Sequence, residues 1–134
     1  MAITVKVNRK TALVLEEPTA EMMNEVIIDA IQDIKGQEIR VYDLRALEDA
    51  PAEFFIFCHG TSTTQVNAMA GSIERKVKDT FGVMPTHIEG RRNASWVLVD
   101  YFDIVVHIFH RETREFYKLE ELWGDAKVIA IDEV

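Results

Sequence analysis

The stretch SWVLVDYFDIVVHIFH, residues 95–110, constrains the fold more than any other part of the chain. Two runs rich in apolar and β-branched residues flank a break at residues 101–103, a pattern typical of an antiparallel β-hairpin. With Phe102 and Asp103 as a two-residue turn, the pairing register of the whole hairpin follows.

That register sorts the side chains onto two faces, because successive residues of a strand point to opposite sides. One face is almost entirely aliphatic and predicts a core: Val97, Val99, Tyr101, Ile104, Val106 and Ile108. The other includes Val105 but mixes aromatic rings with a carboxylate and an imidazole. Carboxylates are rarely buried without a partner, so we expect this face, or the adjacent tip, to bind another molecule. The candidate partner-binding residues are Trp96, Leu98, Asp100, Asp103, His107 and Phe109. For His107 we expect a polar contact with Asp100 or with the partner.

Length and composition predict one domain over residues 1–134, with 48% apolar residues to build a core. The chain has no apolar run long enough to span a membrane and no visible secretory signal, so we expect a cytoplasmic protein. The lone Cys58 lies in an apolar run and is expected to be a small buried hydrophobe. A net charge of −8 disfavours nucleic-acid binding and favours a basic protein partner.

Periodicity and capping signals predict the other elements. A helix is expected from Thr19 as N-cap to Lys35-Gly36, with Gly36 at C′. A second helix follows the Gly60-Thr61-Ser62 turn and ends at Gly82. Strands are expected at 38–44, at 54–59 (buried on both faces), at 86–89 and, at a sheet edge, within 125–134. Residues 1–18 fit either a hairpin turning at 8–10 and packed on a sheet edge, or a loose arm.

The segment RETREFYKLEELWG after His110 is rich in helix formers and predicts an amphipathic cover on the sheet. We expect Phe116, Leu119 and Leu122 to face the sheet, and Trp123 to lie in the core or at its edge. The element order predicts an α/β fold, a mixed β-sheet flanked by helices, with a parallel, right-handed unit over 54–89.

Enzymatic patterns are weak. The Gly60-Thr61-Ser62 turn between a strand and a helix resembles the opening of nucleotidyltransferases, but no acid follows it to hold the metal ions that this chemistry needs. His107 and His110, three apart on a strand, point to opposite faces and do not form a metal pair. We therefore expect no catalytic residue, no metal and no cofactor, and a protein that is not an enzyme.

An ordered set of short motifs resembles the ribosomal silencing factor (RsfS, Iojap) family over about residues 21–123. The matching pieces are Lys35-Gly36, Tyr42-Asp43-Leu44, Phe57-Cys58-His59-Gly60-Thr61-Ser62, Glu89-Gly90, Trp96 to Asp100, Asp103 to Phe109, and Tyr117-x-Leu119-Glu120-x-Leu122-Trp123. Phe102 departs from the glycine that family members often carry before the turn aspartate. Residues 1–18 and 125–134 look like extensions of the family core.

The resemblance implies a non-enzymatic protein with a nucleotidyltransferase-like fold that lacks the metal-binding carboxylates. It implies binding to the large ribosomal subunit through its fourteenth protein, on the face that meets the small subunit. Occupying that face blocks subunit joining and represses translation when nutrients are scarce. Family members can also self-associate as homodimers. Two alternatives stay open: a nucleotide-binding or nucleotidyltransferase-like protein, and a dimeric interaction module with a non-ribosomal partner.

Overall fold

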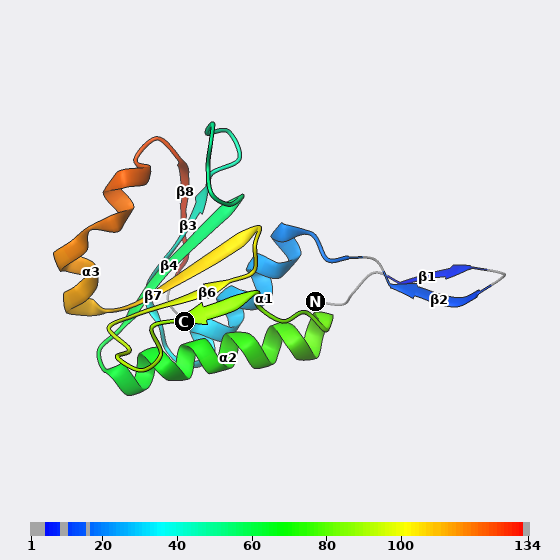
Figure 1. The fold of residues 1–134 in the computed structure, drawn as a ribbon, viewed down its shortest axis with the longest axis horizontal. Helices are drawn as coiled ribbons and strands as arrows, with labels where there is room; N and C mark the ends of the chain where they lie inside the picture. The colour runs from blue at the N-terminus through cyan, green and yellow to red at the C-terminus, as the bar shows by residue number, and fades with distance from the viewer. Residues whose placement is uncertain (1–4, 9–10, 16, 133–134) are drawn as a thin grey trace.

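In the computed structural model, which describes residues 5–8, 11–15 and 17–132, a six-stranded mixed sheet carries helices on both faces (Figure 1). The strand order is β5-β6-β7-β4-β3-β8, and β1 and β2 form a separate two-stranded sheet. The elements are β1 (Val5–Asn8), β2 (Thr11–Leu15), α1 (Ala20–Asp33), β3 (Gln37–Asp43), β4 (Phe54–Gly60), α2 (Thr63–Phe81), β5 (His87–Glu89), β6 (Trp96–Asp100), β7 (Ile104–His110), α3 (Arg111–Tyr117), the 3-10 helix η1 (Leu119–Trp123) and β8 (Lys127–Ala130). The expected α/β class is confirmed.

The sheet is mixed because β4 pairs in parallel with β7, whereas every other pair of neighbouring strands in this sheet is antiparallel. The expectation of a parallel unit over 54–89 is therefore only partly right. β5 runs in the direction of β4 but lies three positions away in the strand order, at the sheet edge beside β6. The strand expected to be buried on both faces is confirmed, since every residue of β4 is buried.

The register expected for residues 95–110 is confirmed. Trp96 lies opposite Phe109 and Asp100 opposite Val105 in the β6–β7 pairing. The Tyr101 N–H donates to the Ile104 carbonyl at 2.8 Å, which closes the turn over Phe102 and Asp103. The two faces predicted from alternation therefore exist and meet different parts of the molecule.

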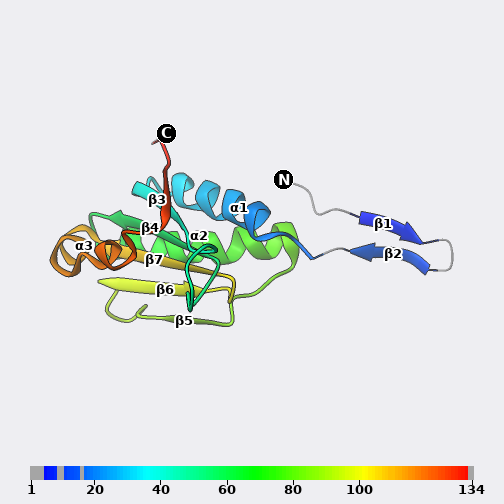
Figure 2. The ribbon, with the colours of Figure 1, turned by 90° about the horizontal axis from the view of Figure 1, so that it is seen from above.

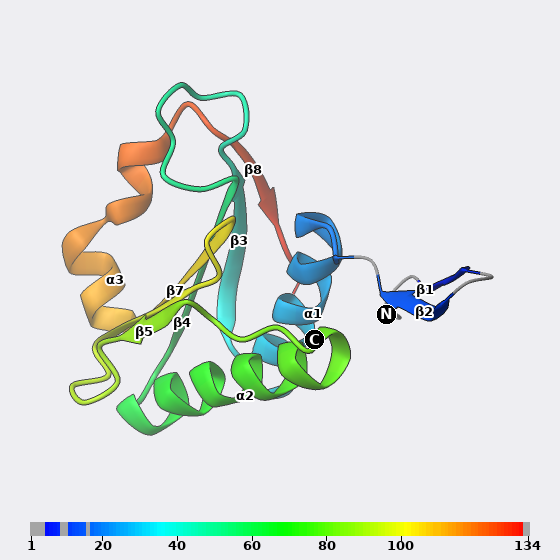
Figure 3. The ribbon, with the colours of Figure 1, turned by 45° about the vertical axis from the view of Figure 1, so that its right-hand side comes forward.

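Helices α1 and α2 cover the aliphatic face, and α3 lies on the opposite side of the sheet (Figure 3). Val97, Val99 and Ile108 are fully buried between the sheet and the first two helices. On the other side, two segments cover the aromatic residues of β3, β4 and β7. The connection between β3 and β4 contributes Leu47, and η1 contributes Leu119 and Trp123. Each of the two predicted faces of the hairpin thus contributes to a different hydrophobic cluster, one on each side of the sheet.

The expectations for the cover segment are partly wrong. Leu119 and Trp123 pack against the sheet, as expected for Leu119 and allowed for Trp123. Phe116 is 79% exposed and Leu122 is 74% exposed, so these two side chains face away from it. The left-handed conformation of Lys118, with φ 48°, breaks the helix between α3 and η1 and changes the direction of the apolar stripe.

The helix caps follow the expected residues, with one correction. Thr19 caps α1 and Ser62 caps α2 through side-chain oxygens. At the end of α1, Lys35 rather than Gly36 takes the left-handed conformation, with φ 61°. Gly36 follows at the next position, where a Cβ would lie 2.3 Å from Ile31 Cγ2, so glycine is required there by packing rather than by its own φ.

The termini add strands in different ways. β8 pairs antiparallel with β3, which confirms the expected edge strand. β1 and β2 pair antiparallel with each other and hydrogen-bond to neither edge of the six-stranded sheet, so the expected hairpin exists but not as an addition to that sheet (Figure 2). Its expected turn at 8–10 falls mostly outside the described residues. Across the described residues, no helix is long and apolar enough to cross a membrane.

Candidate functional site

The mixed face of the β6–β7 hairpin is built on a hydrogen bond between its two most unusual side chains. Trp96 Nε1 donates to His107 Nδ1 at 3.2 Å, across the strand pair. The Trp96 ring also stacks on Phe109, with centroids 5.1 Å apart, and contacts Tyr117 of α3. Trp96 remains half-buried, so part of the indole is available to a partner.

His107 lies beneath this surface and is 4% exposed. It stacks on Phe57 at 4.9 Å and meets the edge of Phe55 at 4.7 Å. Burial lowers the pKa of His107 to about 4, against the opposing effect of Asp100. The imidazole is therefore neutral at pH 7, with the proton on Nε2 because Nδ1 accepts from Trp96. That Nε2 is buried and has no hydrogen-bond partner among the described residues.

The six predicted residues divide into two groups. Phe109, 1% exposed, lies with His107 in the core and supports the face from below. Trp96, Leu98 and Asp100 are half-buried, and Asp103 is exposed at the tip. Of the six, these four side chains are the ones that a partner can reach. The polar contact of His107 is the hydrogen bond from Trp96, and among the described residues no hydrogen bond joins His107 to Asp100.

A cleft of about 400 Å³ opens beside this face, between β5, β6 and the connection before β4. Its walls combine carboxylates, imidazoles and apolar groups, among them His87, Glu89, Leu98, Asp100, Phe102 and His107. We call it the Asp100 cleft. His87 Nε2 lies 3.7 Å from Asp100 Oδ2, and Asp100 Oδ1 accepts the Phe102 N–H at 2.7 Å. Asp100 therefore shapes the turn as well as carrying charge.

Gly90 holds the loop that leads into this face. Its φ is 88°, and a Cβ there would lie 2.1 Å from the Trp96 carbonyl oxygen. The close approach leaves room only for glycine, so the loop between β5 and β6 is fixed beside Trp96.

Asp103 belongs to a different cleft. Its carbonyl accepts hydrogen bonds from the N–H groups of Glu53 and Phe54, which fixes the hairpin tip against the start of β4. With Phe102 it lines a second hollow of about 570 Å³ beside residues 44–53. Asp100, before the turn, and Asp103, within it, thus line separate hollows. In the part of the chain that the structure describes, no three His, Cys, Asp or Glu side chains gather as a metal-binding group.

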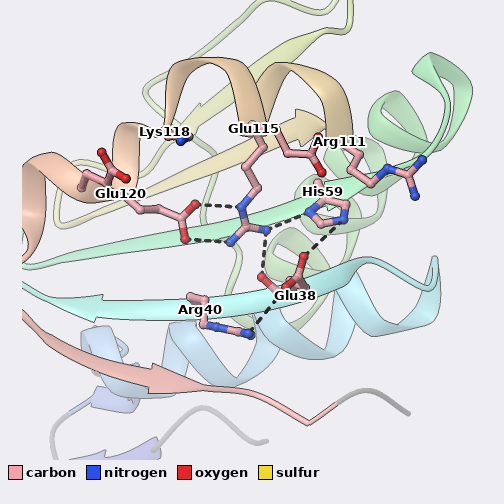
Figure 4. A pocket seen from close by; sticks show the side chains of 9 residues that line it. Glu38, Arg40, His59, Arg111, Glu115, Lys118 and Glu120 are labelled. Carbon is pink, nitrogen blue, oxygen red and sulfur yellow. Dashed lines mark hydrogen bonds and ion pairs between the residues drawn. The ribbon is translucent and has the colours of Figure 1, made fainter.

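A second polar site, which the sequence analysis did not identify, lies at the opposite end of the same sheet face. Figure 4 shows its side chains from close by. Arg114 of α3 is 9% exposed and donates two hydrogen bonds to the carboxylate of Glu120, both at 2.8 Å. Its third nitrogen, Nη1, lies 2.9 Å from the Glu38 carbonyl oxygen and 3.0 Å from His59 Nδ1. We call these four residues the Arg114 cluster, and it borders a hollow of about 360 Å³.

The spacing of these residues in the sequence does not predict the Arg114 cluster. Arg114 and Glu120 are six residues apart, which is not a helical neighbour spacing, and Lys118 breaks the helix between them. His59 is 2% exposed, and burial together with Arg114 lowers its pKa. Cys58, fully buried one residue earlier, has its pKa raised to about 12 by burial, in keeping with the expected inert hydrophobe.

Comparison of the sequence with known proteins identifies one family. The family model described as ribosomal silencing factor during starvation matches residues 17–134. The chain belongs to the ribosomal silencing factor family. The match extends past the core of about 21–123 expected from motifs and includes β8.

Individual members of the family are similar over most of the chain. Ribosomal silencing factor RsfS of Bacillus subtilis is 40% identical over 103 residues, covering 77% of this chain and 86% of that protein. The homologue from Halalkalibacterium halodurans is 36% identical over 110 residues, covering 82% and 92%. The chloroplastic protein Iojap of Zea mays is 33% identical over 102 residues, covering 76% of this chain and 43% of the plant protein.

Solved structures share the fold. A crystal structure of a Chromobacterium violaceum protein is similar with a TM-score of 0.75 and 36% identity, covering 80% of this chain and 88% of that one. A crystal structure of a Bacillus halodurans protein gives a TM-score of 0.72 and 30% identity, covering 83% and 99%.

Proposed function

We propose that this chain binds the large ribosomal subunit through the exposed part of the β6–β7 face and sterically blocks joining of the small subunit. The docking partner is the fourteenth protein of the large subunit, and the outcome is repression of translation. The family supports the ribosomal role, because the matching proteins are named for silencing ribosomes.

One observation carries the assignment to this face: the face combines an aromatic ring, a carboxylate and a buried polar atom without a hydrogen-bond partner among the described residues. Trp96 is a half-buried aromatic ring with apolar Leu98 beside it, and Asp100 supplies the carboxylate. His107 Nε2 lies below them without a partner among the described residues. Aromatic anchors surrounded by a polar rim are typical of binding hot spots.

Electrostatics and size agree with the proposal. The net charge of −8 favours a basic partner, as ribosomal proteins are. A stable interface needs about 800 Å² from each side, which the hairpin face and its rim can provide together. Steric occupation suffices for silencing, so no catalytic step is required.

The test is co-sedimentation of the purified protein with isolated large subunits, followed by a subunit-joining assay on sucrose gradients. We expect the protein to pellet with large subunits and to reduce the fraction of joined ribosomes. Failure to co-sediment at modest salt would contradict the proposal and favour a non-ribosomal partner. Binding without an effect on joining would contradict the steric mechanism alone.

A further inference from the structure

Phe102, at the tip of the β6–β7 hairpin, combines an unfavourable backbone conformation with an exposed aromatic side chain, and neither stabilises the fold. Its φ is 74°, in the left-handed region that aromatic residues rarely adopt. Its side chain is 74% exposed, so burial of the ring does not compensate for the backbone strain. A glycine would make the same turn at lower cost.

The turn holds this ring in a fixed place. The Phe102 N–H donates to Asp100 Oδ1 at 2.7 Å, and the Asp103 N–H donates to the Tyr101 carbonyl at 2.9 Å. The peptide groups on both sides of Phe102 are therefore tied to their neighbours. An exposed aromatic ring on a fixed backbone loses little conformational freedom on binding.

Carboxylates flank the ring on both sides. Phe102 lines the Asp100 cleft, which also contains Glu89, and it lines the second hollow with Asp49, Glu53 and Asp103. The cation in the second hollow, Arg45, is already paired with Asp43 and Glu21. In the Asp100 cleft, His87 Nε2 lies 3.7 Å from Asp100 Oδ2 and 4.0 Å from Glu89 Oε1. A basic side chain of a partner that lies on the Phe102 ring can take the place of this imidazole beside the two carboxylates.

A second observation points to a ligand in the Asp100 cleft. His107, 4% exposed, lines this cleft, and its Nε2 has no hydrogen-bond partner among the described residues. A buried polar atom left without a partner is costly, and a bound group that supplies an acceptor removes that cost. A carbonyl oxygen of the partner backbone, next to the basic side chain, has the right chemistry.

We propose that the Asp100 cleft receives a lysine or arginine side chain of the ribosomal partner, with Phe102 as the aromatic platform and Glu89 and Asp100 as its counter-charges. This inference rests on the proposed function and adds a residue, Phe102, that the predicted site did not contain. It assigns the strained turn to binding rather than to folding.

The experiment compares three substitutions at one position, using isolated large subunits as the probe. Phe102→Tyr keeps the ring and should bind as the unmodified protein does. Phe102→Ala and Phe102→Gly should each weaken binding by roughly threefold to thirtyfold, the range of a cation–aromatic contact. Phe102→Gly should melt at or above the temperature of the unmodified protein, because it relieves the positive φ.

A double-mutant cycle tests the basic side chain directly. Glu89→Gln should weaken binding in the unmodified protein and have a smaller effect in the Phe102→Ala background, since both groups contact the same cation. Glu25→Gln, an exposed carboxylate on α1 behind the sheet, is the matched control and should leave binding unchanged.

The outcomes separate the two proposals. If the unmodified protein does not bind large subunits, the proposed function and this inference both fail. If it binds and Phe102→Ala binds equally well, the proposed function stands and the inference is overturned. Strictly additive effects of Phe102→Ala and Glu89→Gln would overturn the basic side chain as the occupant.

Discussion

The Arg114 cluster and the Asp100 cleft lie on the same face of one sheet, and each contains a buried histidine from adjacent parallel strands. His59 on β4 is 2% exposed and His107 on β7 is 4% exposed. His59 shares a hydrogen bond with Arg114, whose nitrogens also bind Glu120 and a backbone carbonyl. His107 has one internal partner, Trp96, and an Nε2 without one among the described residues.

The difference distinguishes a site completed inside the chain from one that a partner can complete. A buried guanidinium is always charged, so it must have its partners in the free protein. A neutral imidazole can leave one N–H unpaired at a cost of about 1–3 kcal/mol. We therefore assign the first region to stability and the second to binding, and the following experiments test that division.

The largest expected effect is at Arg114. Arg114→Met should lower the free energy of unfolding by about 3–5 kcal/mol, because it leaves Glu120 and the Glu38 carbonyl without their buried donor. Urea unfolding measures it. Arg111→Met, at an exposed neighbour on the same helix, is the control and should change stability by less than about 0.5 kcal/mol. If the two variants were equally stable, the Arg114 cluster would not stabilise the fold.

The next effect is the pH dependence of stability through His107. Its pKa is lowered from 6.5 to about 4 in the folded state, so the unfolded chain binds the proton first as the pH falls. Stability from this group is complete above about pH 6.5 and is lost progressively down to about pH 4, by as much as about 3 kcal/mol.

His107→Gln isolates that contribution from other titrating groups, including His59. Thermal melts of the unmodified protein and the variant should converge as the pH falls from 6.5 to 4, because only the unmodified protein carries the His107 linkage. A stability difference that is constant over this range would show that His107 is not held neutral by burial.

A smaller effect is expected at Asp100, on binding alone. Asp100→Asn keeps an oxygen that accepts the Phe102 N–H but removes the charge, so we expect affinity for large subunits to fall about tenfold, or about 1.4 kcal/mol. The unfolding free energy should stay within about 0.5 kcal/mol. Asp100→Arg is a poorer test because it also removes the acceptor that holds the turn. If the folded Asn variant binds normally, the charge of Asp100 has no role in docking.

The smallest effect is at Lys118, which matches Phe102 in having a positive φ but lies at the Arg114 cluster. Lys118→Gly should raise stability by up to about 1 kcal/mol, since glycine adopts the left-handed helix cap without strain. Its binding to large subunits should not change, unlike that of Phe102→Gly. Parallel losses of binding in both glycine variants would abolish the distinction between the two regions.

Local patterns in the sequence were enough to place most elements. Alternation over residues 95–110 predicted both faces of the hairpin and its register, and the structure confirms them. Thr19 and Ser62 signalled two helix starts because capping is a local interaction. The mixed sheet with helices on both faces followed from the order of these elements.

The candidate site was predicted less completely. Period-2 alternation shows which side chains share a face, but it does not show what covers that face. Phe109 is buried in the cluster that the β3–β4 connection and η1 cover, and His107 is buried against the rings of Phe55 and Phe57. Trp96 and Asp100 stay half-buried at the surface. The exposure of Phe116 and Leu122 depends likewise on the break at Lys118, where a non-glycine residue adopts a left-handed conformation without a sequence signal.

The sequence by itself determined the elements, the two faces of the hairpin and the family, since each depends on residues close together in the chain or on ordered motifs. Only the tertiary structure decided that β7 is the parallel neighbour of β4, that Arg114 reaches His59 and Glu38, and that Phe102 lies between two hollows lined by carboxylates. The physical reason is distance along the chain: Arg114 and Glu38 are 76 residues apart, and contacts of that kind form only when the packed layers bring them together.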